Sequence, residues 1–274
     1  MTDFGQVFSY FQYGFVRNAL IVGILLSVCA ALLGVSLVLK RYSMIGDGLS
    51  HVGFGACAVA LPLGITPLYF SIPVVIIAAF LLLRLGKSSK IKGDAAIALV
   101  SSSALAIGYT VIKLTGKGSV DISNFMFGSI YTVNTEDMIV TAVLSAAAIT
   151  LYVLFYNKLF AVTFDEEFAE ATGVKVSRYT TLLAVLTAVT VVVGMRMMGA
   201  LLISSLIIFP VLTASRVCKS YRSVIVTAVS VSVINFLLGL TLSLILNTSP
   251  GSSVVIVNLI VFVIFTLVGR FLKK

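Results

Sequence analysis

The sequence predicts an all-α protein that crosses a membrane many times. Of its 274 residues, 59% are hydrophobic and only 11% are charged. Soluble domains carry roughly a quarter of charged residues, so this composition excludes the soluble globular class. Apolar runs of about 17 to 25 residues, long enough to cross the hydrocarbon core, recur along the chain. Since no polar stretch reaches the roughly 50 residues of a small domain, we expect residues 1–274 to form a single transmembrane domain.

Nine apolar runs qualify as transmembrane helices. In chain order they cover residues 16–39, 48–64, 67–86, 94–114, 136–156, 179–196, 199–216, 222–246 and 252–272. The second run and the sixth and seventh runs are short. Short or glycine-interrupted spans can be broken or re-entrant helices where they line a cavity. The sequence therefore predicts eight or nine transmembrane helices.

The basic residues predict the orientation of these spans. With the N-terminus outside and nine alternating spans, all but four of the 19 Lys and Arg residues lie in the cytoplasm, together with the C-terminus. The four exceptions are Arg17, Lys113, Lys117 and Arg196. This bias is the positive-inside rule, and it accounts for the net charge of +9. Nucleic-acid binding is disfavoured because the charges lie singly or in pairs beside spans instead of forming one basic face.

Asp47 and His51 are the candidate metal ligands. They lie at the edge of the second apolar run, and His51 is the only histidine. An ionisable side chain within a span indicates a functional site. A spacing of four places both side chains on one face of a helix. Carboxylate and imidazole both bind zinc, and manganese when more oxygen ligands are added. A structural role, which does not exclude the first, has Asp47 as the N-cap of the helix and His51 bonded to a backbone carbonyl.

A dense glycine pattern surrounds the pair. It consists of Gly46, Gly48, Gly53 and Gly55. Such glycines permit either an unwound helix start or a close approach between helices. Simple alternation of spans places Asp47 near the inner boundary, so a site midway across the membrane requires this stretch to bend inward. Two ligands do not complete a zinc site, and a symmetric dimer would supply four.

The polar loop at residues 157–178 contains a predicted short amphipathic helix. Phe164 and Phe168 fall on one face, and Gly173 suits the position just after the helix end. Its acids are Asp165, Glu166, Glu167 and Glu170. A lone helix of this length is marginal in water. Surface helices bound to anionic lipid favour Lys and Arg, so the acids indicate a protein partner.

Several enzyme classes lack their residues in this sequence. There is no G-x-x-x-x-G-K-[ST] loop for ATP hydrolysis, and a single histidine excludes H-E-x-x-H. An intramembrane Ser-His hydrolase would need His51 as its base and a serine such as Ser204 brought to it by folding. We expect a transport protein that is not itself an enzyme and binds no permanent cofactor.

Four motifs together resemble the membrane permease of bacterial ATP-binding-cassette importers for zinc and manganese. They are LKRYSMIGDGLSH at 39–51, FGSI at 127–130, FDEEFAEATG at 164–173 and GALLISSLIIFP at 199–210. The resemblance covers nearly the whole chain. It implies a homodimer in the bacterial plasma membrane, two cytoplasmic ATPase subunits and an extracytoplasmic metal-binding protein.

The resemblance also implies roles for particular residues. Asp47 and His51 correspond to the family's intramembrane metal ligands, and residues 164–173 correspond to the coupling helix that docks on the ATPase. Two imidazoles and two carboxylates suit tetrahedral zinc, which we favour over manganese. The alternative function is an ATP-independent secondary metal transporter or channel, in which residues 164–173 have no docking partner.

Overall fold

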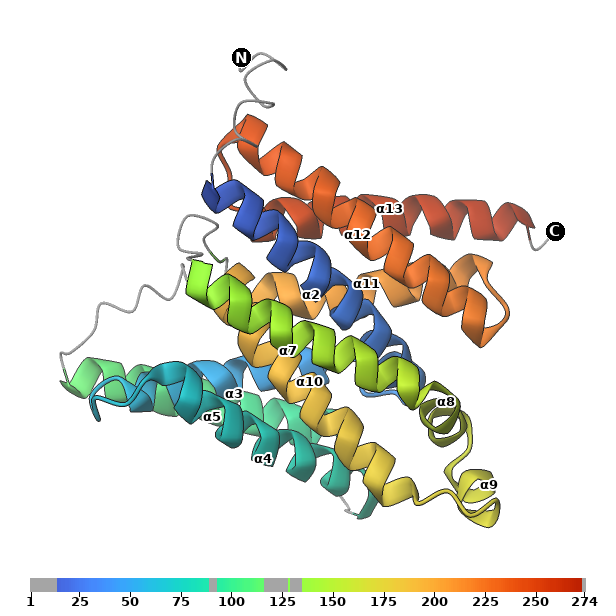
Figure 1. The fold of residues 1–274 in the computed structure, drawn as a ribbon, viewed down its shortest axis with the longest axis horizontal. Helices are drawn as coiled ribbons and strands as arrows, with labels where there is room; N and C mark the ends of the chain where they lie inside the picture. The colour runs from blue at the N-terminus through green and yellow to red at the C-terminus, as the bar shows by residue number, and fades with distance from the viewer. Residues whose placement is uncertain (1–13, 89–92, 116–127, 129–134, 273–274) are drawn as a thin grey trace.

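The computed structural model describes residues 14–88, 93–115, 128 and 135–272, which contain eleven helices and no strand (Figure 1). In chain order these are α2 (Gly14–Leu39), α3 (Ile45–Ala60), α4 (Pro67–Ser88), α5 (Gly93–Thr115), α7 (Thr135–Leu154), α8 (Tyr156–Phe164), α9 (Glu166–Ala171), α10 (Val176–Met198), α11 (Ala200–Val217), α12 (Tyr221–Leu246) and α13 (Pro250–Leu272). The all-α class is confirmed for the described residues. Of the FGSI motif at residues 127–130, only Gly128 belongs to the residues that the structure describes.

Seven of these helices are long and apolar enough to cross a membrane. They are α2, α5, α7, α10, α11, α12 and α13. The remaining two predicted spans correspond to α3, which has only 16 residues, and α4, whose apolar part is Pro67–Leu83. The total of eight or nine spans and the orientation of the termini stay predictions.

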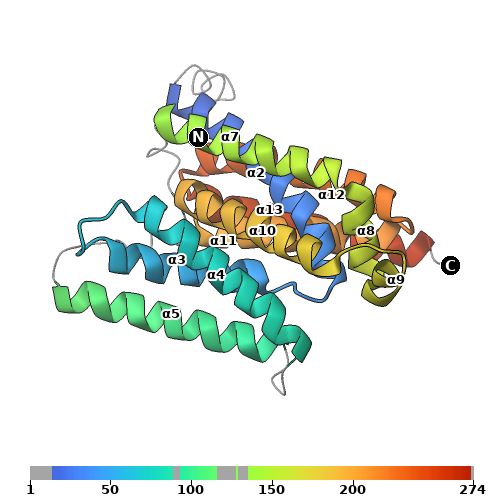
Figure 2. The ribbon, with the colours of Figure 1, turned by 60° about the horizontal axis from the view of Figure 1, so that its bottom comes forward.

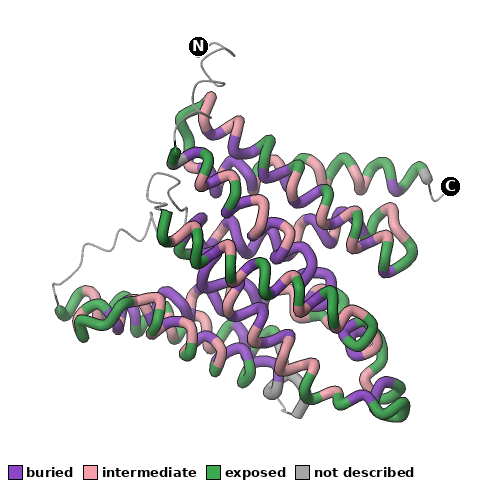
Figure 3. Tube along the Cα trace, viewed as in Figure 1, coloured by how far each residue is buried: buried purple, intermediate pink, exposed green. Residues whose placement is uncertain are grey.

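The spans form two groups joined by α10. Helices α3, α4 and α5 pack together on one side, while α2, α7, α11, α12 and α13 form the larger group (Figure 2). Helix α10 packs against α4 on one side and against α2, α7 and α11 on the other. Helices α2, α10 and α11 are the most deeply buried spans, and purple segments mark this core in Figure 3. The outer faces of α5, α7 and α13 are apolar and exposed, as lipid-facing helices require.

The glycines of α3 permit close packing of helices. A Cβ atom on Gly55 would lie 2.6 Å from the carbonyl oxygen of Ala104 on α5. A Cβ atom on Gly108 of α5 would lie 2.8 Å from Cα of Gly55. Similarly, Gly46 faces α11, and Gly48 faces α5. Of the two predicted roles, close approach is the one observed, because α3 is a regular helix from Ile45 onward.

Candidate functional site

Asp47 lies inside α3, in its first turn. The helix begins at Ile45, and the N-cap position belongs to Met44, which makes no side-chain cap. The interpretation of Asp47 as an N-cap is therefore wrong, because the helix starts three residues earlier than that role requires. The Asp47 side chain is free to point out of the helix toward its neighbours.

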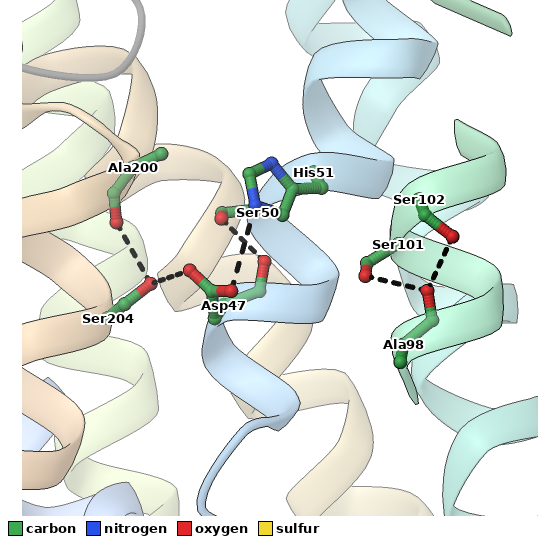
Figure 4. Close-up of polar contacts among 8 residues, drawn as sticks. All are labelled: Asp47, Ser50, His51, Ala98, Ser101, Ser102, Ala200 and Ser204. Carbon is green, nitrogen blue, oxygen red and sulfur yellow. Dashed lines mark hydrogen bonds and ion pairs between the residues drawn. The ribbon is translucent and has the colours of Figure 1, made fainter. Parts of the chain in front are cut away.

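Asp47 and His51 share one face of α3, as predicted from their spacing. Nε2 of His51 lies 3.6 Å from Oδ2 of Asp47 (Figure 4). The exposed fraction is 41% for the Asp47 side chain and 21% for that of His51. Both side chains are thus held in the bundle yet accessible from one side. Ser50, adjacent in sequence, instead donates to the backbone carbonyl of Asp47 at 2.7 Å and is buried.

Ser204 of α11 also contacts Asp47. Its hydroxyl donates to the carbonyl of Ala200 at 3.0 Å and shares its proton in a longer contact of 3.5 Å with Oδ1 of Asp47 (Figure 4). Neither contact is with His51, which does not match the Ser-His arrangement of a hydrolase. Sequence reasoning did not assign Ser204 to the metal site. The one sequence feature that points to Ser204 is that it is a polar residue within an apolar span.

The contact with Ser204 also fixes where Asp47 lies along the bundle. Ser204 is the fifth residue of α11, so at 1.5 Å per residue Asp47 is about 20 Å from the end of α11 at Val217. That end is the predicted cytoplasmic one. Simple alternation of spans predicts Asp47 near the inner boundary, and the contact with Ser204 favours the other prediction, a site deeper within the bundle. The linker after α2 turns back into the bundle, so that α3 begins beside Ile207, where Gly46 packs.

Asp47 and His51 form an incomplete ligand set by themselves. Among the residues that the structure describes, no group of three or more His, Cys, Asp and Glu side chains is close enough to hold a metal ion. Zinc sites in proteins take three or four such ligands. The pair therefore needs further ligands from solvent or from another chain.

The predicted cytoplasmic helix is present as α9. Asp165 is its N-cap and accepts a hydrogen bond from the backbone N–H of Phe168 at 2.9 Å. Gly173 follows the helix end with a φ of +82°, as the sequence predicted. Ala169 is buried against Val162 and Val174, whereas Phe168 is exposed. Helix α9 is thus seated on the protein by one face and presents the other outward.

A cleft of about 540 Å³ opens beside α9, between α4 and α10. Its lining comprises Phe80, Leu83, Glu166, Glu167, Glu170, Val176, Ser177, Thr180, Thr181 and Ala184. Three of the predicted coupling acids therefore line one concave surface. Glu166 additionally forms an ion pair with Lys40. The residues predicted for coupling lie together at this end of the bundle, away from the Asp47 and His51 pair.

The fold and the site define a polytopic helical membrane protein with an acid and an imidazole held together inside the bundle. The chain belongs to the ABC 3 transport family, whose model matches residues 12–269. This confirms the resemblance drawn from the four motifs.

Individual relatives cover almost the whole chain. The high-affinity zinc uptake system membrane protein ZnuB of Haemophilus influenzae is 30% identical, over 90% of this chain and 94% of its own length. The manganese import system permease protein ScaB of Streptococcus gordonii is also 30% identical, over 96% and 95%. The solved structure of PsaBC from Streptococcus pneumoniae in complex with Fab matches with a TM-score of 0.85 and 31% identity, covering 96% of this chain and 95% of that one.

Proposed function

We propose that this chain is the permease subunit of an ATP-binding-cassette importer that carries a divalent transition metal inward across the bacterial plasma membrane. The observation that carries the proposal is the Asp47 and His51 pair, accessible from one side and far from the predicted cytoplasmic end of α11. An intramembrane acid beside an imidazole marks an ion path. The names of the relatives support metal import as the cargo class.

A homodimer completes the site in this proposal. Two copies related by a twofold axis would bring two carboxylates and two imidazoles to one point, the four ligands that zinc takes. The partial exposure of both side chains leaves them accessible to a second copy. The ion would pause at this site and leave, so the affinity needs to be modest.

We propose zinc over manganese as the cargo. The relatives include a zinc system and a manganese system, so the preference rests on the number of ligands. Two carboxylates and two imidazoles would supply the four ligands that tetrahedral zinc takes, whereas manganese needs further oxygen ligands.

The energy would come from two ATPase subunits docked at the cytoplasmic end. Phe164 at the end of α8 and Phe168 on α9 are exposed, and exposed apolar side chains at this position suit a protein partner. An extracytoplasmic metal-binding protein would deliver the ion to the opposite end. In this arrangement eight or nine spans cross the membrane, with the N-terminus outside and the C-terminus inside.

The test is uptake into proteoliposomes containing this chain, its ATPase subunits and its metal-binding protein, with zinc and manganese compared. We expect ATP-dependent uptake, faster for zinc, which His51→Ala lowers by about 100-fold or more because it removes a direct ligand. Thr110→Ala, an exposed substitution on α5, is the control. Uptake without ATP would contradict the importer, unchanged uptake by His51→Ala would contradict the site, and faster manganese uptake would reverse the metal preference.

A further inference from the structure

The linker at residues 40–44 joins the end of α2 to the start of α3, close to Asp47. It is tightly folded. Arg41 has a φ of +65°, and the backbone N–H groups of Arg41 and Tyr42 donate to the carbonyls of Val38 and Leu37 at 3.0 and 2.9 Å. These two bonds make a Schellman turn, which here contains a non-glycine residue in the left-handed region. The linker therefore has a fixed conformation, and this conformation sets where α3 begins.

Lys40, at the start of this linker, reaches α9. Its Nζ lies 2.8 Å from Oε1 of Glu166, and the Lys40 side chain is only 6% exposed. Exposed ion pairs contribute little because water screens them, but a buried charge requires its partner. Burial and the Glu166 carboxylate also raise the pKa of the Tyr42 phenol, which places Tyr42 in the same surroundings. Glu166 therefore contacts the linker at Lys40, and its charge also acts on Tyr42.

The end of α2 is also tied to the segment that precedes α9. Ser36, one turn before Lys40, bonds to the Tyr221 hydroxyl at 3.2 Å. The Tyr221 ring packs against Phe160 and Phe164 of α8, with centroids 4.9 and 5.6 Å apart. Helix α8 leads directly into α9. The end of α2 is thus connected to the α8–α9 segment in two ways, directly by the Lys40–Glu166 ion pair and indirectly through Tyr221 of α12.

We propose that the Lys40–Glu166 ion pair links the coupling helix to the metal site, so that a displacement of α9 is passed through the linker to Asp47. The proposal rests on the proposed function, since it assigns the path by which the ATPase acts on that site. Figure 2 shows the linker running from the end of α2 to α3, while α9 lies at the end of the bundle. Lys40 and Glu166 are positioning residues in this account, because neither contacts the metal ligands.

The test measures metal ions taken up per ATP hydrolysed by the complete complex in proteoliposomes. We expect Lys40→Met and Glu166→Gln to lower this ratio about tenfold while ATP hydrolysis continues, because the ATPase turns over without moving α3. Lys40→Arg keeps the charge and should retain the wild-type ratio. Lys219→Met removes an exposed lysine between α11 and α12 and is the matched control.

A second variant keeps the test decisive if a single substitution disturbs folding. The exchange Lys40→Glu with Glu166→Lys restores opposite charges and should recover the ratio toward wild type. An unchanged ratio in Lys40→Met would overturn the link, as would an exchange variant that assembles normally but stays uncoupled. If the wild-type complex shows no ATP-dependent uptake, the proposed function itself fails, and this result is distinct from a failure of the link.

Discussion

Two of the polar clusters in the described bundle differ in how completely their groups are bonded. Ser36, Tyr152 and Tyr221 form a closed triangle of hydroxyl groups at 3.0 to 3.2 Å. Tyr152 is 1% exposed. Asp47 and His51, by contrast, lie 3.6 Å apart and are partly exposed, and the Ser204 contact is 3.5 Å long.

This difference fits a structural role for the triangle and the proposed ligand role for Asp47 and His51. Each hydroxyl in the triangle bonds to both of the others, as buried polar groups in a stable core require. The Asp47 and His51 pair has long contacts and spare lone pairs, which leaves it able to bind an ion. The triangle also joins α2, α7 and α12, whereas the pair lies on α3 alone apart from Ser204. We therefore expect substitutions in the two clusters to affect different properties.

Replacement of His51 should have the largest effect, and it should act on binding. We expect His51→Ala to weaken zinc binding to the detergent-solubilised protein by about 100-fold, while the free energy of unfolding changes by roughly 0.5 kcal/mol or less because the side chain is partly exposed. Metal titration and thermal unfolding of the same sample measure both. A large loss of stability without loss of binding would reverse the roles of the two clusters.

Replacement of Tyr152 should have the opposite signature. Tyr152→Phe removes one hydroxyl from the triangle and leaves Ser36 and Tyr221 bonded to each other, so the expected loss of stability is about 1 kcal/mol. A loss of about 1 kcal/mol lowers the equilibrium constant for folding roughly fivefold. Metal uptake per folded protein should not change. Tyr69→Phe, at an exposed tyrosine, is the matched control, and it should have no effect on unfolding.

Replacement of Ser204 should have the smallest effect of the three. Its hydroxyl contact with Asp47 is long, so its net contribution is small, and we expect Ser204→Ala to weaken zinc binding only about twofold. Ser205→Ala on the same helix is the control, because the Ser205 hydroxyl donates to the carbonyl of Leu202. Equal effects of the two substitutions on zinc binding would show that Ser204 does not orient the carboxylate.

The sequence predicted the features that depend on local patterns. Apolar run length predicted the seven long spans, and the spacing of four predicted that Asp47 and His51 share a face. The apolar face and Gly173 predicted α9 and its end. Each of these features depends on residues that lie close together in the sequence. The sequence alone was therefore enough to predict them.

The features that sequence reasoning missed depend on contacts between distant segments. The start of α3 inside the bundle follows from the linker turn at Arg41, a residue type that rarely adopts a positive φ. The contact of Ser204 with Asp47 joins residues 157 positions apart, and the Lys40–Glu166 pair joins residues 126 positions apart. No periodicity or spacing along one helix indicates which partner such a residue meets.

The proposed sharing of one metal site by two copies of the chain can be tested by the stoichiometry and ligand set of zinc bound to the purified protein, measured by metal analysis and X-ray absorption spectroscopy. We expect one zinc ion per two chains, with two nitrogen and two oxygen ligands at about 2.0 to 2.2 Å, and its loss in Asp47→Asn. One zinc ion per chain, retained by a monomer, would contradict the shared site.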